Sequence, residues 1–517
     1  MEMNNALINW LPLAIVLLPF FAGLALYLAG EKKPEMINSL VLISTILPLF
    51  LTATLYPPVA AGQFPSMALD ILPPVGLSFR IDYLSFYALL LFAIAGLIVS
   101  VYALNYLDRC EARRHRFFGF YLLVLSGCYG VAMAGDFFSF YLFFEFMSIM
   151  FFVLVAHNQS GEAIRAAYKF LIMTIIAGVT LFLAVAVIYW ETGSLSFASP
   201  GLGLEQSNLV LIAFIGFIVA FGIKSALFPL HLWMPDAYSE APLPAATISS
   251  MIMLKTGAYG LIRVYGNIYG TEFLAETQWS YYLVILTGFT ILFGSVVALA
   301  QEDLIRRLAY SGIAQVGYII LGIALVNELA LTGATYHILA HAFMKGTLFL
   351  CAGLMIRVSG SRIIADLKGI GRKLPVTMIC FTIATITAVG MPPFNIFISK
   401  WHLGLGALEA ESLVIVLILL ASSMLNAAYY LPIVTRAFLG AGSGEGTNHP
   451  ETEPGGTNLA GPAGIGENNR SGFPLLAEAP AALLVPVIIL ALGCFMFGLT
   501  PVNLPLDLIE RGIALYF

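Results

Sequence analysis

Long apolar runs recur along almost the whole chain, separated by short polar breaks. Each run is about 18–25 residues long, and a membrane-spanning helix needs about 20 such residues. The runs do not alternate between polar and apolar residues as barrel strands do, so helices are the remaining way to satisfy their backbone in lipid. The sequence therefore predicts an all-α polytopic membrane protein with about 14 transmembrane helices. The runs lie near residues 7–29, 36–55, 82–105, 117–134, 137–156, 164–190, 208–228, 243–265, 280–300, 308–326, 329–356, 375–408, 413–438 and 477–499.

Composition narrows the functional classes. Hydrophobic residues make up 60% of the chain and charged residues only 10%, whereas a soluble domain carries about 25% charged residues. The five cysteines form no CxxC pair, and no glycine-rich nucleotide fingerprint is present. We therefore expect no redox cofactor, no metal centre, no nucleic-acid partner, and no redox or hydrolytic site of the chain's own.

The 24 basic residues predict the orientation of the chain. Four are lysines inside apolar runs, three (Arg80, Arg263 and Arg511) fall on one side of the predicted bundle, and seventeen fall on the other. Cytoplasmic loops are enriched in Lys and Arg, so we expect a multi-pass protein of the cell membrane with both termini on the outer face. Because no positive charge precedes the first run, we expect that helix to be retained.

Five ionisable residues lie inside the apolar runs. They are Glu145, Lys224, Lys255, Lys345 and Lys400. Each costs roughly 2.5–3.5 kcal/mol at the membrane centre on insertion scales, and buried ionisable residues in spanning helices usually mark an ion or proton path. The set therefore predicts ion translocation.

Glu145 in the fifth run and Lys224 in the seventh are candidates for an interacting pair. Opposite charges about 4 Å apart attract by roughly 4 kcal/mol at an effective dielectric near 20. Making and breaking such a pair would switch Lys224 between holding and releasing a proton. The alternative is a static buried salt bridge that only supports the fold.

His337, His341 and Lys345 follow one another at i, i+4 and i+8 in the eleventh run. This spacing places them on one helix face. Histidine titrates near neutral pH, so the ladder suits proton relay, and structural polar packing is the alternative. Metal binding by the two histidines is disfavoured because no carboxylate lies nearby in sequence.

Lys255 and Lys400 complete the predicted path. Lys255, flanked by Ser249, Ser250 and Thr256, would link two halves of the protein, unless it is simply paired with backbone carbonyls at a helix end. Lys400 would exchange protons with one surface, unless its side chain snorkels to the headgroups.

The segment 231–244 follows the seventh run on the basic side and contains His231, Asp236 and Glu240. These residues would guide ions at a channel mouth, or they would form a solvated turn. The sequence favours neither interpretation.

Proline interrupts two of the runs at related places. Pro229 and Pro235 follow Lys224, and Pro392 and Pro393 precede Lys400. The two broken helices, seven and twelve, are five helices apart and therefore run in opposite directions, which is typical of inverted repeats around a mid-membrane site; coincidence is the alternative. The predicted units are helices 1–3 (residues 1–110), two inverted five-helix repeats (111–270 and 271–440), a flexible Gly/Pro-rich loop (441–476) and a last helix (477–517).

Several motifs resemble those of the antiporter-like subunits of respiratory complex I, of Mrp-type Na⁺/H⁺ antiporters and of membrane-bound hydrogenases. Residues 221–263 contain the lysine, the HxWxPDAxxEAPxP run and the KTGxYGxxR run in family order, and RRLAYSGIAQVGY, HILAHAFMKGTLF and MPPFNIFISKW also fit. The resemblance covers roughly residues 80–440. It implies fourteen core helices in two inverted five-helix units.

The resemblance also implies roles for single residues. Glu145 and Lys224 match the family's paired glutamate and lysine, Lys255 its central lysine, and His337, His341 and Lys345 its eleventh-helix polar residues. The lysine at position 400 resembles the residue of the Mrp D-type and hydrogenase-type subunits, whereas one complex I subunit has glutamate there. Only about 18 residues follow the last predicted helix, so no long lateral helix is expected.

The family implies partners as well: other integral membrane subunits, H⁺, and a role for Na⁺ that stays open. The leading interpretation is a translocating subunit of the Mrp D-type or of the kind associated with hydrogenases. The alternatives are a proton-pumping subunit of a complex I-type NADH/quinone oxidoreductase and a purely structural subunit.

Overall fold

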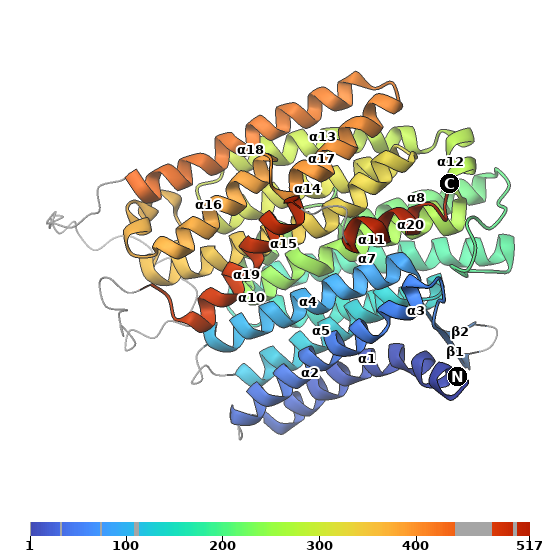
Figure 1. Cartoon of the computed structure of the whole chain (residues 1–517), viewed down its shortest axis with the longest axis horizontal. Helices are drawn as coiled ribbons and strands as arrows, with labels where there is room; N and C mark the ends of the chain where they lie inside the picture. Colours follow the sequence, from blue (N-terminus) through green and yellow to red (C-terminus); the bar gives the residue numbers. More distant parts are fainter. Residues whose placement is uncertain (1, 31–33, 73–74, 108–112, 440–477, 500–503) are drawn as a thin grey trace, which may run out of the picture.

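The computed structural model describes residues 2–30, 34–72, 75–107, 113–439, 478–499 and 504–517. It is a bundle of helices that run side by side along the long axis of the molecule (Figure 1). The longer helices are α1 (Glu2–Ala29), α2 (Pro34–Thr54), α4 (Tyr83–Tyr106), α5 (Arg114–Met133), α6 (Phe137–Val155), α7 (Gly161–Thr192), α8 (Asn208–Lys224), α13 (Ser280–Ala300), α14 (Leu304–Ala324), α15 (Glu328–Ser359), α16 (Pro375–Val389), α17 (Asn395–Glu409), α18 (Leu413–Leu439) and α19 (Ala481–Leu499).

Shorter helical elements connect or extend these helices. They are α3 (Tyr56–Ala60), α9 (Met234–Glu240), α10 (Leu243–Ile248), the π-helix η2 (Ser249–Met253), α11 (Leu254–Arg263), the π-helix η3 (Val264–Tyr269), α12 (Thr271–Thr277), the 3₁₀ turns η4 (Ile364–Leu367) and η5 (Ile370–Arg372), and α20 (Leu504–Ile513). The helical fold class is confirmed.

Eleven helices within the described ranges are long and apolar enough to cross a membrane. The three other predicted runs are divided. The run at 208–228 stops being helical after Lys224, the run at 243–265 contains π-helical turns, and the run at 375–408 is interrupted between α16 and α17. The total of fourteen crossings therefore stays a prediction.

A two-stranded antiparallel hairpin, β1 (Ser66–Leu72) and β2 (Val75–Arg80), was not predicted. Its register pairs Ser66 with Arg80 and Leu69 with Leu77. The strands are shorter than any spanning run, so a search for long apolar segments passes over them. The buried Phe79 of β2 packs against Phe143 of α6, with ring centroids 5.6 Å apart, which fixes the hairpin to one end of the bundle.

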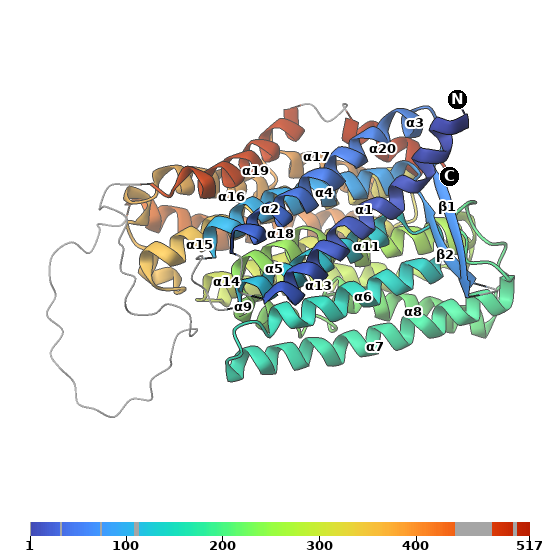
Figure 2. The same cartoon turned by 90° about the horizontal axis from the view of Figure 1, so that it is seen from below.

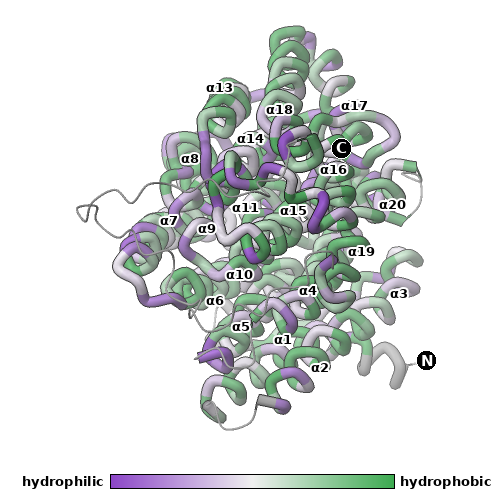
Figure 3. Tube along the Cα trace, turned by 90° about the vertical axis from the view of Figure 1, so that its left-hand side faces the viewer, coloured by the Kyte–Doolittle hydropathy of each residue, from purple (hydrophilic) through white to green (hydrophobic). Residues whose placement is uncertain are grey.

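Helices α4, α5, α14 and especially α15 form the interior, whereas α1, α2, α7 and α18 expose apolar side chains. Seen along the helices, α15 lies in the middle of the bundle (Figure 3). It packs against α14, α16, α17 and α19. Polar side chains on α15 can therefore meet only other protein groups or enclosed water.

The two helix breaks have local causes. Gly390 ends α16 with a left-handed φ of +88°, a conformation that glycine adopts without steric cost, and Pro392 and Pro393 lie before α17 begins. In the other broken run, Lys224 is the last residue of α8, and α9 has Pro235 in its first turn, a position that proline favours.

Both ends of the chain lie at the same end of the bundle (Figures 1 and 2). This agrees with an even number of crossings, although which membrane face this end occupies stays a prediction. The loop at 440–475, together with Lys32, Lys33, Arg109 and Arg470, lies outside the described residues, and so do the boundaries of the predicted unit 441–476.

Candidate functional site

Lys224 and Glu145 lie near enough to interact electrostatically but form no ion pair within the part of the chain that the structure describes. The buried Lys224 ammonium donates to the Ser148 hydroxyl and lies 4.9 Å from the centre of the Phe144 ring. Glu145, three residues before Ser148 on α6, has a buried Oε1 with no hydrogen-bond partner among the described residues. The predicted alternative of a static salt bridge is therefore not the arrangement seen.

The Glu145 carboxyl packs against a glycine. A Cβ at Gly178 of α7 would lie 2.7 Å from the Glu145 Cδ. Because Gly178 has no side chain, the Glu145 carboxyl can occupy the space beside it. Glu145 is one helical turn from Ser148, which accepts from Lys224.

Lys255 lies at the start of α11, directly after the π-helix η2, and its ammonium donates to the Ser250 carbonyl. A π-turn frees carbonyls from ordinary helical bonding and is common at functional sites. A small, largely apolar cavity of about 10 Å³, roughly the room for one water molecule, lies beside Lys255; Tyr87, Tyr259 and Thr335 also line it, together with five apolar side chains. Of the flanking residues, Ser249 lies 3.1 Å from the Tyr238 hydroxyl and Thr256 donates to Met253.

The two histidines of α15 are fully buried and differ in their partners. His337 Nδ1 lies 2.7 Å from the Ser399 hydroxyl and its Nε2 lies 3.0 Å from Gln315 Oε1. The His341 ring stacks on the His337 ring at 6.0 Å, but neither of its nitrogens has a hydrogen-bond partner among the described residues. The ladder shares one face as predicted, yet its hydrogen bonds stop at His341.

Lys345, one turn further along α15, is fully buried. Its ammonium donates to the Leu308 carbonyl at 2.7 Å, to the Ser311 hydroxyl, and to the Tyr430 hydroxyl at 3.2 Å. All three acceptors are neutral oxygens. They come from α14 and α18, which brings these helices into the site.

Lys400 lies at the break between α16 and α17 and is partly buried. Its ammonium donates to the Ala388 and Val389 carbonyls at 3.3 and 3.0 Å and to the Ser423 hydroxyl at 2.8 Å. It also lies 5.1 Å from the centre of the Tyr318 ring. The side chain therefore turns into the protein and does not snorkel, because it binds the carbonyls that the end of α16 leaves free.

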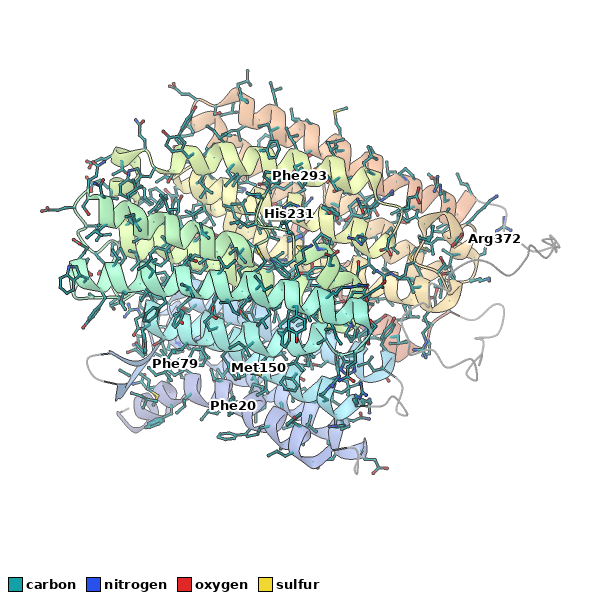
Figure 4. All side chains as sticks on the ribbon, turned by 180° about the vertical axis from the view of Figure 1, so that it is seen from behind. Phe20, Phe79, Met150, His231, Phe293 and Arg372 are labelled. Carbon is teal, nitrogen blue, oxygen red and sulfur yellow. The ribbon has the colours of Figure 1, made fainter. Side chains whose placement is uncertain are left out.

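His231, predicted at a channel mouth, is buried. Its ring packs against Phe293, which is labelled with it in Figure 4, at 5.1 Å, and against Phe228 at 5.6 Å. Its Nδ1 has no partner within the described ranges. The structure thus separates His231 from the water-exposed charges of the same segment.

Asp236 and Glu240 do lie at the surface of the bundle. Asp236 forms ion pairs with Lys169 of α7 at 2.8 Å and Arg306 of α14 at 2.7 Å, and 32% of its side chain is exposed. Partial burial raises the pKa of the Glu240 carboxyl, and nearby Arg362 opposes that shift. Asp236 therefore connects the two predicted repeats by its ion pairs.

Sequence reasoning missed the neutral partners of the lysines and histidines. They are Ser148, Ser311, Gln315, Ser399, Ser423 and Tyr430. Single hydroxyl or amide residues in apolar helices are too common to be noticed. Ser148 at i+3 from Glu145, and Ser311 and Gln315 at i and i+4 on α14, would have given a signal by their spacing.

A fully buried ion pair was also missed. Arg263 makes two hydrogen bonds of 2.7 Å to the Asp82 carboxylate and further bonds to the Tyr259 and Tyr516 hydroxyls. In the sequence analysis, Arg263 counts only as one of the three basic residues on one side of the predicted bundle. Its partner is 181 residues away in sequence, so no local pattern could reveal it.

Two family models match the chain. One, described as NADH:quinone oxidoreductase/Mrp antiporter, transmembrane, matches residues 134–426, and the other, described as the complex I chain 5 N-terminus, matches residues 74–118. The chain is 36% identical over 496 residues to the N-type subunit of the NADH-quinone oxidoreductase of Desulforudis audaxviator, covering 95% of both proteins. It is 29% identical to the D-type subunit of the Na⁺/H⁺ antiporter of Alkalihalophilus pseudofirmus, covering 85% of this chain and 88% of that one.

Solved structures share the fold. A chain of the Mrp complex from Dietzia sp. superimposes with a TM-score of 0.83 at 24% identity, covering 99% of this chain and 97% of that one. A chain of respiratory complex I from Thermus thermophilus superimposes with a TM-score of 0.78 at 23% identity, covering 99% and 100%.

Proposed function

Because this chain belongs to the NADH:quinone oxidoreductase/Mrp antiporter transmembrane family, we propose that it moves protons through its row of buried lysines and histidines. It is an antiporter-like subunit of the kind found in Mrp and complex I-type membrane complexes. The ion, the path and the orientation in the membrane are parts of the same proposal.

The observation that carries the proposal is the nature of the lysines' partners. Among the described residues, Lys224, Lys255, Lys345 and Lys400 bind hydroxyls and backbone carbonyls, and none forms an ion pair. A carboxylate held in contact would fix the charge of a buried lysine. Neutral oxygens accept from the ammonium and release the neutral amine, so the lysine can change its protonation state.

Lys224 is the proposed switch. Its ammonium binds Ser148 of α6. Glu145 lies one turn before Ser148 on α6, and one of its carboxylate oxygens has no hydrogen-bond partner among the described residues. Because Lys224 ends α8 at a helix break, a small rotation of its long side chain can exchange the neutral hydroxyl for the charged carboxylate. Contact with Glu145 would hold a proton on Lys224, and return to Ser148 would let it pass on.

From Lys224 the proposed path leads to Lys255 and then to the polar residues of α15, which are His341, His337 and Lys345. It ends at Lys400. Lys255 has an adjacent cavity for about one water molecule, and His341 has two nitrogens that water could bridge. Asp236 and Glu240 would collect cations at the basic face. The exchange of Na⁺ for H⁺ belongs to this proposal because a relative is named for it.

The proposed setting is a cell membrane complex with other integral subunits, with both termini on the outer face. The seventeen-to-three division of basic residues supports this orientation. Exposed apolar side chains along α7, such as Val179 and Trp190, fit contact with lipid or with neighbouring subunits.

A second candidate function is a proton-pumping subunit of a complex I-type oxidoreductase. The 36% identity to a relative named as an oxidoreductase subunit, against 29% to the one named as an antiporter subunit, favours it. The two candidates differ in what drives the protons. Iron–sulfur absorbance in the purified complex would indicate the oxidoreductase, and a complex without such clusters that exchanges Na⁺ for H⁺ would indicate the antiporter.

The proposal is tested with the intact complex in lipid vesicles that contain a pH-sensitive dye. The Lys224→Ala and Lys400→Ala variants should each lose most proton movement, and Lys368→Ala, a change at an exposed lysine, should retain it. Full proton movement in both buried-lysine variants would favour a structural role for the subunit.

A further inference from the structure

Helix α18 carries a polar face, and the proposed path uses only two of its members, as hydrogen-bond partners of Lys345 and Lys400. Its members are Ser422, Ser423, Asn426, Tyr429 and Tyr430, at i, i+1, i+4, i+7 and i+8, which places them on one side of the helix. All but Ser423 are buried, whereas the opposite side of α18 exposes apolar residues such as Leu420 and Met424. An outer helix of a membrane bundle thus turns a continuous polar strip toward the protein interior.

This strip touches both lysines of the second half. At one end, the Tyr430 hydroxyl accepts from Lys345 at 3.2 Å and lies 2.7 Å from the Ser311 hydroxyl. At the other end, Ser423 accepts from Lys400 at 2.8 Å. The stretch of helix from Ser423 to Tyr430 spans roughly 10 Å. The strip therefore reaches from one lysine to the other.

The middle of the strip is hydrogen-bonded as well. The Tyr429 hydroxyl donates to Asn426 Oδ1, and the Asn426 amide donates to the Ala388 carbonyl at 3.0 Å. That carbonyl also accepts from Lys400 at 3.3 Å. The Tyr429 and Tyr430 rings lie 4.6 Å apart.

One buried tyrosine of α14 faces the same region. The buried Tyr318 hydroxyl lies beside Ser422, Ser423 and Asn426, but its geometry to them is too poor for a regular hydrogen bond, and no other described residue bonds it. Buried polar atoms in proteins are normally bonded to protein or to enclosed water. The Tyr318 hydroxyl therefore points to water between α14 and α18.

The histidine ladder of α15 also leads from Lys345 to Lys400, through His341 and His337. His337 contacts Ser399, next to Lys400 in sequence, and Lys345 lies one turn beyond His341. Because both nitrogens of His341 lack partners in the described part of the chain, that ladder contains a gap on each side of His341. The α18 strip has a direct hydrogen bond to each lysine.

We infer that the polar face of α18 lines a second proton connection between Lys345 and Lys400, parallel to the histidines. This inference rests on the proposed function. In each transfer an N–H bond of the Lys345 ammonium breaks as an O–H bond forms on Tyr430, and the original O–H bond of Tyr430 breaks as its proton passes to enclosed water. At the other end a water molecule beside Ser423 gives up a proton, which forms an N–H bond on the Lys400 amine. One proton moves in total. Asn426 orients its neighbours and carries no proton.

The experiment measures proton flux in vesicles that contain the intact complex, under an imposed K⁺ diffusion potential. The variants are Tyr430→Phe, His341→Phe and the double variant. Tyr102→Phe is the matched control, because the Tyr102 hydroxyl is buried and donates to a backbone carbonyl outside both strips. Assembly of each complex is checked by native gel before flux is measured.

Rates of parallel connections add. Each single variant should therefore keep at least about a third of the flux, while the double variant should fall more than about tenfold, well below the product of the two single effects. Tyr102→Phe should resemble the unchanged protein. A merely structural effect of Tyr430 would multiply with that of His341 and would not produce this excess.

Two results would overturn the inference. Tyr430→Phe without effect in the His341→Phe background would show that α18 carries no protons, and full loss in either single variant would show a single serial path. Failure of the proposed function would look different: Lys345→Ala and Lys400→Ala would keep full flux in the same vesicles.

Discussion

At the scale of single residues, the Glu145 carboxyl can occupy its position because the neighbouring residue on α7, Gly178, has no side chain. A methyl group at Gly178 would lie 2.7 Å from the Glu145 Cδ. The Gly178→Ala variant should fold, since the carboxyl is the end of a flexible side chain, but the carboxyl must move relative to Lys224. A displacement of about 1 Å in a reacting group can cost up to about a hundredfold in rate.

We therefore expect Gly178→Ala to lower proton flux at least about tenfold, measured in vesicles with a pH-sensitive dye. Gly161→Ala, on the same helix but with no atom within 4 Å of the added methyl, is the control and should leave flux unchanged. Equal flux in the two variants would mean that the place of the Glu145 carboxyl is unimportant.

At the scale of elements, the break between α16 and α17 both ends a helix and seats a lysine. Gly390 has a φ of +88°, and a methyl group there would lie 2.8 Å from Lys400 Cδ. Gly360 ends α15 with a φ of +73° but has no atom within 4 Å of an added methyl. The two glycines thus share the backbone cost of substitution but differ in their contact with the lysine.

Gly390→Ala and Gly360→Ala should each destabilise the protein by about 1–2 kcal/mol, the cost of left-handed backbone for a residue with a Cβ. Only Gly390→Ala should also reduce proton flux. Thermal unfolding and flux measured on the same preparations separate the two effects. A parallel loss of flux in Gly360→Ala would assign the loss to stability alone.

The same elements show how far sequence reasoning reached. The long apolar runs predicted the helices, and the prolines near Lys224 and Lys400 predicted both breaks, because these signals are local. The ladder on α15 followed from its spacing. The contact of Lys224 with Ser148 and of Lys345 with Tyr430 could not be predicted, because it depends on how distant helices are rotated against each other.

Polar residues without charge were the other omission. The face of α18 contains serine, asparagine and tyrosine; polar side chains of this kind occur in spanning helices and gave no signal against the apolar background. The hairpin of β1 and β2 was missed for a different reason, since its strands are shorter than a membrane span. Counting polar residues at helical spacing in every run would have detected the α18 face.

At the scale of the whole molecule, one buried ion pair connects distant parts of the chain. Asp82 precedes α4, Arg263 ends α11, and Tyr516 follows α20; their side chains are joined by hydrogen bonds of 2.7 Å and 3.1 Å to the guanidinium. The Arg263 side chain is 1% exposed. Removing only the carboxylate would leave an uncompensated charge in the interior, which typically costs about 3–5 kcal/mol.

We therefore expect Asp82→Asn to lower the thermal stability of the full chain sharply and to reduce the amount recovered from membranes. Asp82→Asn combined with Arg263→Gln should regain more than half of the loss, because replacing both members of a buried pair removes the uncompensated charge. Asp507→Asn, which breaks the exposed pair with Arg511, should leave unfolding unchanged. If the double variant were as unstable as Asp82→Asn, hydrogen bonding by Arg263 to Tyr259 and Tyr516 would be the stabilising element, and the charge of Asp82 would be secondary.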